Sequence, residues 1–310
     1  MKRLLSLVAL LTASCSQADA TERPNIIFVL ADDMGLGDLS CYGGTITPTP
    51  QIDRLANEGT RFTQYYSASP ICSPSRCGLI TGQFPARWKI TSYLQSRAGN
   101  RECEQADFLD PTAPSLPRVL KSANYATAHI GKWHLGGGRD VTDAPKFAAY
   151  GYDLGLGTYE SPEPAAGLGL KSLPWGKEIE PQQIARHHRT RWMVDETLAF
   201  LSRNSSQPCF VNLWLDDTHT PWAPENVARE KGRDRDNLIA VITELDRQIG
   251  RLMDGVPANS LIIFATDNGA LPKLGSPGPR RGFKGQVYEG GLLVPALLEW
   301  PARYPKPQVI

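Results

Sequence analysis

The sequence has almost no excess of either charge, no zinc-type cysteine spacing and no apolar run long enough to span a bilayer. Its 33 basic and 32 acidic residues leave a formal net charge of +1, so neither nucleic acid nor an acidic membrane surface is favoured as a partner. No two of the six cysteines have C-x-x-C spacing, which argues against a structural zinc site. What remains is the composition of a globular protein, and 310 residues suffice for one large α/β domain or two smaller ones.

The first twenty residues have the pattern of a secretory signal peptide. Lys2-Arg3 precede the apolar run 4–11, and Ala18-Asp19-Ala20 fits an A-x-A cleavage site. The run is too short for a transmembrane helix, and we expect no transmembrane segment elsewhere. A lipoprotein signal acylated at Cys15 and an ordinary N-terminal helix are the alternatives. We expect residues 1–20 to be a signal peptide and the protein to be secreted or periplasmic.

Four further cysteines leave the disulfide question open. An oxidising compartment permits disulfides among them, and buried free thiols are the alternative. The four are Cys41, Cys77, Cys103 and Cys209.

Continuous apolar runs predict strands that are buried on both faces. Residues 25–31, 209–215 and 261–265 have this pattern, and residues 125–130 form a fourth candidate. Runs of this length are typical of parallel sheets covered by helices.

Helical patterns lie between these strands. Residues 49–58 open with a capping residue followed by proline, and residues 182–203 also predict a helix. One further helical face is formed by Leu238, Ile242, Leu245, Ile249 and Leu252. The alternation predicts a doubly wound, mostly parallel α/β sheet with helices on both faces. The Gly- and Pro-rich residues 136–177 predict a long loop over one end of that sheet.

Polar pairs follow two of the predicted strands. Asp32-Asp33 come directly after the first strand, and Asp267-Asn268 come after the last one. Ligands of doubly wound sheets collect at the carboxyl ends of strands, and oxygen donors suit Ca²⁺ or Mg²⁺. Each pair taken alone is also a common turn or cap.

The segment from Cys72 to Gly82 carries the most specific pattern. It contains C-x-P-S-R-x-x-L-x-T-G with every fixed position met, and it closely resembles the signature of the type I sulfatases of the alkaline-phosphatase superfamily. The resemblance covers residues 25 to about 301 and implies an alkaline-phosphatase-like fold and a sulfuric ester hydrolase. It also implies that a formylglycine-generating maturation enzyme converts Cys72 to Cα-formylglycine. Family members continue further, so it implies a sulfatase catalytic domain over 21–310 in a C-terminally truncated chain, without the C-terminal subdomain.

A hydrated aldehyde suits sulfate-ester hydrolysis for a chemical reason. One of its two hydroxyls attacks sulfur and displaces the alcohol. Deprotonating the other breaks the C–O bond, expels sulfate and regenerates the aldehyde, whereas a sulfated thiol or serine would need a second attack at sulfur. Pro74 suits the first turn of a helix, which places Cys72 just before that helix, where its N-terminus favours an anion.

A second element, residues 124–136, resembles the sulfatase pattern G-Y-x-T-A-x-x-G-K-W-H-L-G. Its one departure is Asn124 in place of glycine, and asparagine also tolerates left-handed backbone. The resemblance assigns Lys132 to a sulfate oxygen and His134 to the hydrate, as the base that triggers sulfate release. We interpret His129, within the strand, as a packed side chain.

Three further elements resemble family motifs. His219 lies in an H-x-P element and is expected to contact the ester oxygen. Lys284 is expected to bind sulfate and to protonate the leaving alcohol, alone or with His219. Arg76 is expected to bond the hydrate or the metal-site carboxylates, and Ser161 is a candidate polar neighbour of the sulfate.

The family resemblance gives the cation a definite role. The metal ligands are expected to be Asp32, Asp33, the residue made from Cys72, Asp267 and Asn268. Ca²⁺ is the family expectation and Mg²⁺ the alternative. The substrate is expected to be a sulfated carbohydrate or an aryl sulfate. A phosphate or phosphonate monoester hydrolase with the same nucleophile, and a non-catalytic binder of sulfated glycans, are the alternative functions.

Overall fold

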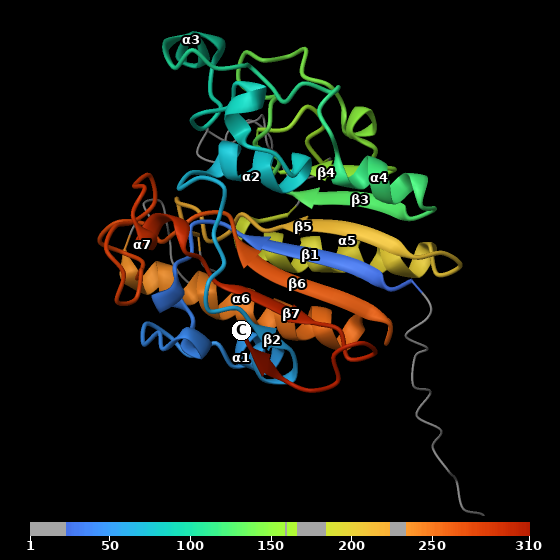
Figure 1. Ribbon diagram of the computed structural model, residues 1–310, viewed down its shortest axis with the longest axis vertical. Helices are drawn as coiled ribbons and strands as arrows, with labels where there is room; N and C mark the ends of the chain where they lie inside the picture. Colours follow the sequence, from blue (N-terminus) through green and yellow to red (C-terminus); the bar gives the residue numbers. More distant parts are fainter. Residues whose placement is uncertain (1–22, 159, 166–183, 224–233) are drawn as a thin grey trace, which may run out of the picture.

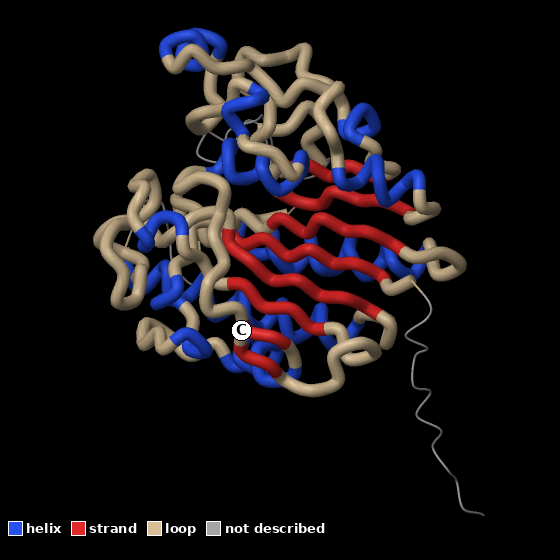
Figure 2. Tube along the Cα trace, viewed as in Figure 1, coloured by secondary structure: helices blue, strands red, loops and turns tan. Residues whose placement is uncertain are grey.

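The computed structural model describes residues 23–158, 160–165, 184–223 and 234–310. In these ranges an eight-stranded sheet runs through the molecule in the order β4-β3-β5-β1-β6-β7-β2-β8, and Figure 2 shows its strands lying side by side. The predicted signal peptide, with Cys15, lies outside the described residues. No helix in the described ranges is long and apolar enough to cross a membrane.

The elements have the following bounds. The strands are β1 Asn25–Ala31, β2 Thr60–Arg61, β3 Ala126–Gly131, β4 Leu154–Gly157, β5 Cys209–Trp214, β6 Ser260–Thr266, β7 Ala296–Glu299 and β8 Gln308–Val309. The α-helices are α1 Pro50–Glu58, α2 Cys72–Thr81, α3 Arg97–Glu102, α4 Leu116–Ser122, α5 Arg189–Arg203, α6 Arg235–Gly255 and α7 Glu289–Leu292.

The centre of the sheet is parallel. Strand β1 lies between β5 and β6 and pairs parallel with both, while β3 pairs parallel with β5 and β4. Strand β7 then pairs antiparallel with β6 and with β2. The predicted mostly parallel α/β fold is therefore confirmed.

Side chains of β1 alternate between two hydrophobic cores. Ile27 and Val29 belong to the core that packs against α1, α5 and α6, and Figure 1 shows α5 and α6 behind the sheet. Phe28 and Leu30 belong to the core on the other face, which includes side chains of α2 and α4. Because successive side chains of a strand point to opposite faces, one apolar run serves both cores.

Helix α6 has the predicted apolar face, and a polar residue beside that face also has a structural role. Asp246 is only 4% exposed, and its Oδ1 accepts hydrogen bonds from the amides of Gln51 at 3.0 Å and Ile52 at 2.8 Å. These amides open α1 and have no partner within that helix. Helix α6 therefore caps α1.

The predicted helix over 182–203 begins later than expected. Helix α5 starts at Arg189, after a 3-10 turn over Arg186–His188, and residues 182–183 lie outside the described ranges. The reason is a tertiary cap, because the amide of Thr190 donates to Asp217 Oδ2 at 2.9 Å.

The predicted loop over 136–177 was wrong for one segment. Residues 154–157 form β4, which pairs parallel with β3 at the edge of the sheet, and a 3-10 turn covers 147–150. Glycines weaken the strand pattern here. Gly155 is nevertheless required, because a Cβ on it would lie 2.1 Å from the ring of Phe147. Residues 166–177 lie outside the described ranges.

The cysteines of the described chain are free. Cys41, Cys72, Cys77, Cys103 and Cys209 all carry unpaired thiols. Of the two alternatives left open by the sequence, the structure has free thiols.

Candidate active site

The two polar strand ends lie next to each other. Strands β1 and β6 pair in parallel with Ala31 opposite Thr266, so Asp32-Asp33 and Asp267-Asn268 leave the sheet at adjacent positions. All four side chains are buried, with at most 4% exposed. The strand register therefore forms the acidic site that the sequence predicts.

Hydrogen bonds connect the two pairs directly. The amide of Asp33 donates to Asp267 Oδ1 at 3.2 Å, and Asn268 Nδ2 donates to Asp33 Oδ1 at 2.8 Å. Asp33 has a left-handed backbone, with φ 58°, a strained conformation that is frequent at functional sites.

Cys72 lies against this acidic pair. It is the first residue of α2, so the helix begins one residue earlier than predicted. Its Sγ is 3.7 Å from Asp32 Oδ1 and 4.0 Å from Asp33 Oδ1. Burial raises the pKa of the Cys72 thiol to about 12, so at neutral pH the group is a thiol and a weak nucleophile.

Arg76, one turn further along α2, bonds the carboxylates of Asp267 and Asp32. Its Nε and Nη2 donate to Asp267 Oδ2 at 3.0 and 2.7 Å, and Nη2 lies 3.3 Å from Asp32 Oδ2. The guanidinium also lies over the ring of Trp214, 5.2 Å from its centroid. Burial alone would lower the pKa of Arg76, but the two carboxylates outweigh it and raise that pKa, so the residue stays charged.

Two lysines reach the acids from different loops. Lys132 Nζ bonds Asp32 Oδ2, and Lys284 Nζ lies 2.7 Å from Asp33 Oδ2. Burial would lower the pKa of each lysine, but their carboxylate partners outweigh it and raise both pKa values. Burial would likewise raise the pKa of Asp32, but Lys132 and Arg76 hold it well below its usual range.

His134 is held as a neutral ring. Its Nε2 lies 3.0 Å from the carbonyl oxygen of Leu94. A carbonyl only accepts, so Nε2 carries the proton of the neutral ring and Nδ1 has a lone pair. Burial, followed by the charge of Lys132, lowers the pKa of His134 well below its ordinary value. The ring has the protonation state of a base.

His219 approaches the acids from the loop after β5. Its Nε2 is 3.6 Å from Asp33 Oδ2, and its Nδ1 donates to the carbonyl of Thr220 at 2.7 Å. Burial, followed by the charge of Lys132, lowers the pKa of His219 well below its ordinary value. The neutral ring therefore presents Nε2 as an acceptor.

The donor set fits a hard divalent cation. Ligand atoms of Asp32, Asp33, Cys72 and His219 lie within 4.8 Å of one another, and Asn268 Oδ1 is buried with no hydrogen-bond partner in the described chain. A buried amide oxygen without a donor costs free energy that a cation would recover. Oxygen-rich clusters of this kind suit Ca²⁺ or Mg²⁺.

Three residues singled out in the sequence lie outside this cluster. His129 stacks on Phe147 with ring centroids 4.9 Å apart and is fully buried, which confirms that it is a packed side chain. Asn124 has φ 61°, the left-handed conformation that its place in the motif requires. Ser161 Oγ accepts a hydrogen bond from the amide of Glu163 at 3.2 Å, a contact within its own turn.

The structure adds a residue that sequence reasoning missed. Thr218 Oγ1 donates to the carbonyl of Asp32 at 2.6 Å and lies 3.2 Å from the Asp32 amide. It fixes the backbone of the acidic pair from the neighbouring strand end. Its one sequence signal is its position directly before His219.

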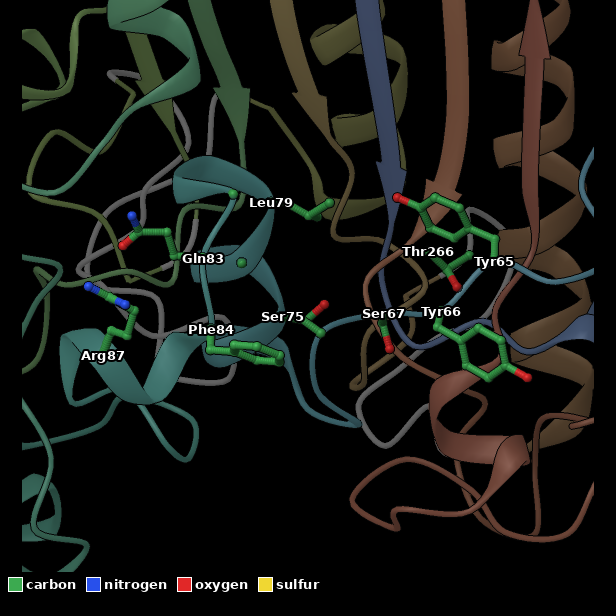
Figure 3. Close-up of a pocket in the computed structure, with 12 residues that line it drawn as sticks. Tyr65, Tyr66, Ser67, Ser75, Leu79, Gln83, Phe84, Arg87 and Thr266 are labelled. Atoms are coloured by element: carbon green, nitrogen blue, oxygen red, sulfur yellow. The ribbon is translucent and has the colours of Figure 1, made fainter.

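A pocket of about 520 Å³ is lined by residues of α2 and by Thr266, which directly precedes Asp267. Figure 3 shows Ser75 and Leu79 of the helix facing Tyr65 and Tyr66 across it, with Phe84 nearby. None of the predicted catalytic residues lines this pocket in the described chain. The pocket therefore adjoins the acidic cluster along α2 and the end of β6.

The chain is similar to several known proteins. A family model described as Sulfatase matches residues 24–310. An N-acetylgalactosamine-6-O-sulfatase of Bacteroides thetaiotaomicron is 31% identical over 98% of this chain and 74% of its own length. An N-acetylgalactosamine-6-sulfatase of Canis lupus familiaris is 31% identical over 98% of this chain, which spans 62% of that relative. A crystal structure of Ps i-CgsB in complex with k-i-k-neocarrahexaose has a TM-score of 0.75 at 27% identity, covering 93% of this chain and 68% of that one.

Proposed function

The chain belongs to the sulfatase family, and from this membership we propose that it hydrolyses the sulfate ester of a sulfated carbohydrate. The observation that carries the proposal is the contact of Cys72 with Asp32 and Asp33, with Sγ–Oδ1 distances of 3.7 and 4.0 Å. A nucleophile beside a cation site suits attack on an anionic ester.

We propose that Cys72 is oxidised to Cα-formylglycine by a maturation enzyme. The unmodified thiol, with its pKa raised to about 12 by burial, is a weak nucleophile. An aldehyde hydrate has no such dependence on a thiolate. One hydroxyl loses its proton to solvent and bonds sulfur while the ester S–O bond breaks and the alcohol leaves. The second hydroxyl later expels sulfate, and water adds to the aldehyde to restore the hydrate.

His134 is suited to accept the proton of that second hydroxyl. Its Nε2 proton is committed to Leu94, so Nδ1 is the basic nitrogen of a ring that burial keeps neutral. As the proton moves to Nδ1, the C–O bond of the sulfated hydrate breaks, the aldehyde forms and sulfate departs.

The two lysines are suited to bind sulfate and to assist the leaving alcohol. Lys132 and Lys284 stay protonated because their carboxylate partners raise their pKa values. Neutral His219 has its proton on Nδ1, toward Thr220, and so cannot donate from Nε2 in that form. Lys284 is therefore our proposed proton donor to the alcohol, and His219 would bond the ester oxygen only in a form that carries a proton on Nε2.

Asp32, Asp33, Asp267 and Asn268, with the residue made from Cys72, would hold the cation. When bound, Ca²⁺ or Mg²⁺ would offset the negative charge of the sulfate and polarise its S–O bonds. Arg76 fixes Asp267 and Asp32 for this task through charged hydrogen bonds.

The names of similar proteins suggest which sulfated carbohydrate to test first. Two of them are named for sulfate on N-acetylgalactosamine, and a similar solved structure holds a neocarrahexaose. We propose a 6-sulfated N-acetylgalactosamine unit as the first substrate to test. We also propose that the protein acts outside the cytoplasm, where such polysaccharides occur.

The test is turnover by protein co-expressed with a formylglycine-generating enzyme. We expect release of sulfate from 6-sulfated N-acetylgalactosamine and from 4-nitrophenyl sulfate, with far slower release of phosphate from 4-nitrophenyl phosphate. The matched control is Cys72→Ala, which keeps the cation ligands of the strand ends. Faster turnover of the phosphate ester, or equal activity of C72A, would contradict the proposal.

A further inference from the structure

The turn that carries His219 is fixed by contacts of its neighbours along the chain. Thr218, directly before it, bonds the backbone of Asp32, and Trp222 Nε1 donates to the carbonyl of Thr218 at 2.7 Å. The ring itself bonds the carbonyl of Thr220, its own neighbour. The position of the imidazole therefore follows the backbone of this turn.

Arg186 bonds the same turn from the segment before α5. Its Nη2 lies 2.9 Å from the carbonyl oxygen of His219 and 3.4 Å from that of Asp216. In the described chain, Nε and Nη1 of Arg186 are buried without hydrogen-bond partners. The two carbonyls are thus the hydrogen-bond acceptors that orient this guanidinium.

The two acids beside this turn are held by other residues, so they leave Arg186 to the backbone carbonyls. Asp216 is paired with Arg189 at 2.8 Å and accepts a hydrogen bond from Thr158 at 2.7 Å, while Asp217 accepts one from the amide of Thr190 at 2.9 Å. A planar guanidinium bound to two carbonyls sets the geometry of a turn more closely than a flexible ammonium does.

We propose that Arg186 is a positioning residue for His219. The inference rests on the proposed sulfatase function, because it assigns Arg186 a role through a residue of that site. His219 Nε2 lies 3.6 Å from Asp33 Oδ2, so a small shift of the turn would change the distance between this ring and the acidic cluster. In this assignment Arg186 acts on His219 through the backbone carbonyls of the turn.

The test compares Arg186→Met and Arg186→Lys with wild type on 4-nitrophenyl sulfate. We expect kcat of R186M to fall roughly 10- to 100-fold, the usual cost of misplacing a catalytic group by about 1 Å, with KM within about threefold. R186K keeps a donor for the carbonyls, so it should recover part of the loss. Arg191 lies nearby in α5, with 57% of its side chain exposed, and pairs with Asp195. The control variants R191M and R191K should keep wild-type kcat.

A double-mutant cycle with His219→Asn separates positioning from general destabilisation. If Arg186 acts through His219, R186M should lower kcat by less than about twofold in the H219N background, because the group it positions is already gone. An equal loss in both backgrounds, or R186M with wild-type kcat, would overturn the inference. If R186M does not fold, as judged by thermal unfolding, R186K carries the same cycle. An inactive wild type bearing the aldehyde would overturn the proposed function and the inference with it, whereas an active wild type with an unaffected R186M would overturn the inference alone.

Discussion

Two buried side chains lie beside the acidic cluster and have different chemical needs. The thiol of Cys72 is a weak nucleophile as it stands, and the amide oxygen of Asn268 has no hydrogen-bond donor in the described chain. Burial keeps the thiol protonated, which favours the proposed modification over direct attack by a thiolate. Because it has no such donor, Asn268 Oδ1 is open to a cation, as the proposed metal site requires. Cys72 is therefore the residue on which the proposed nucleophile depends, and Asn268 is one on which the proposed cation site depends.

Replacing Cys72 with serine should stop the reaction after one turnover. In a host without a maturation system, the serine hydroxyl can attack sulfur but has no second hydroxyl to expel sulfate. We expect C72S to release at most one 4-nitrophenol per protein and to gain roughly 80 Da, one sulfo group. Intact-mass spectrometry after incubation measures this. Sustained turnover by C72S would contradict the role of the geminal hydroxyls.

Replacing Asn268 with leucine should weaken cation binding. The variant keeps the volume of the side chain but removes the unpartnered Oδ1 and the bond from Nδ2 to Asp33. We expect Ca²⁺ affinity to fall roughly 10- to 100-fold, as measured by calorimetric titration of metal-free protein. An unchanged affinity would remove Asn268 from the metal site, and a Mg²⁺ titration tests which cation is preferred.

At the scale of elements, carboxylates from distant segments cap the starts of two helices. Asp246 of α6 caps α1, and Asp217 caps α5. The start of α1 was predictable because Thr49 and Pro50 carry a local signal. The start of α5 was not, because Asp217 reaches Thr190 only once β5 is in place.

Removing the cap of α1 should cost measurable stability. Asp246→Ala leaves the amides of Gln51 and Ile52 without this acceptor, and we expect the free energy of unfolding to fall by about 1 to 2 kcal/mol. Asp254→Ala is the matched control on the same helix, because its carboxylate is 70% exposed and pairs with Arg54. Urea unfolding of both variants measures their free energies of unfolding. Equal stability of the two would contradict the cap.

His129 should make the folded protein sensitive to acid. Burial lowers its pKa to about 3 in the folded state, while the unfolded chain has a value of about 6.5. As pH falls below 6.5 the unfolded state gains a proton that the folded state does not, so stability is lost. The pKa difference predicts a loss of about 2 kcal/mol at pH 5 relative to pH 8.

His129→Phe removes this titration and keeps an aromatic ring beside Phe147. The difference in unfolding free energy between wild type and H129F should therefore change by about 2 kcal/mol between pH 8 and pH 5, in favour of the variant. Urea titrations at both pH values measure it. A difference that is the same at both pH values would show that His129 is protonated in the folded state.

For the whole molecule, the sequence predicted the sheet and the acidic site from one feature. Apolar runs buried on both faces end in polar pairs, and parallel strands bring such ends together at one edge. Strand β4 escaped prediction because glycines hide its pattern. The contacts of Thr218 and Arg186 could not be predicted, because they depend on β5 lying beside β1. No local pattern in the sequence indicates that pairing.

Turnover should depend on the chemical state of residue 72, and both can be measured on the same samples. Preparations made with increasing amounts of the maturation enzyme are digested, and mass spectrometry gives the fraction of peptide that is roughly 18 Da lighter, the change from thiol to aldehyde. We predict that kcat for the sulfate ester rises in proportion to this fraction and extrapolates to zero for the thiol form. Full turnover by protein that carries only cysteine at this position would contradict the account.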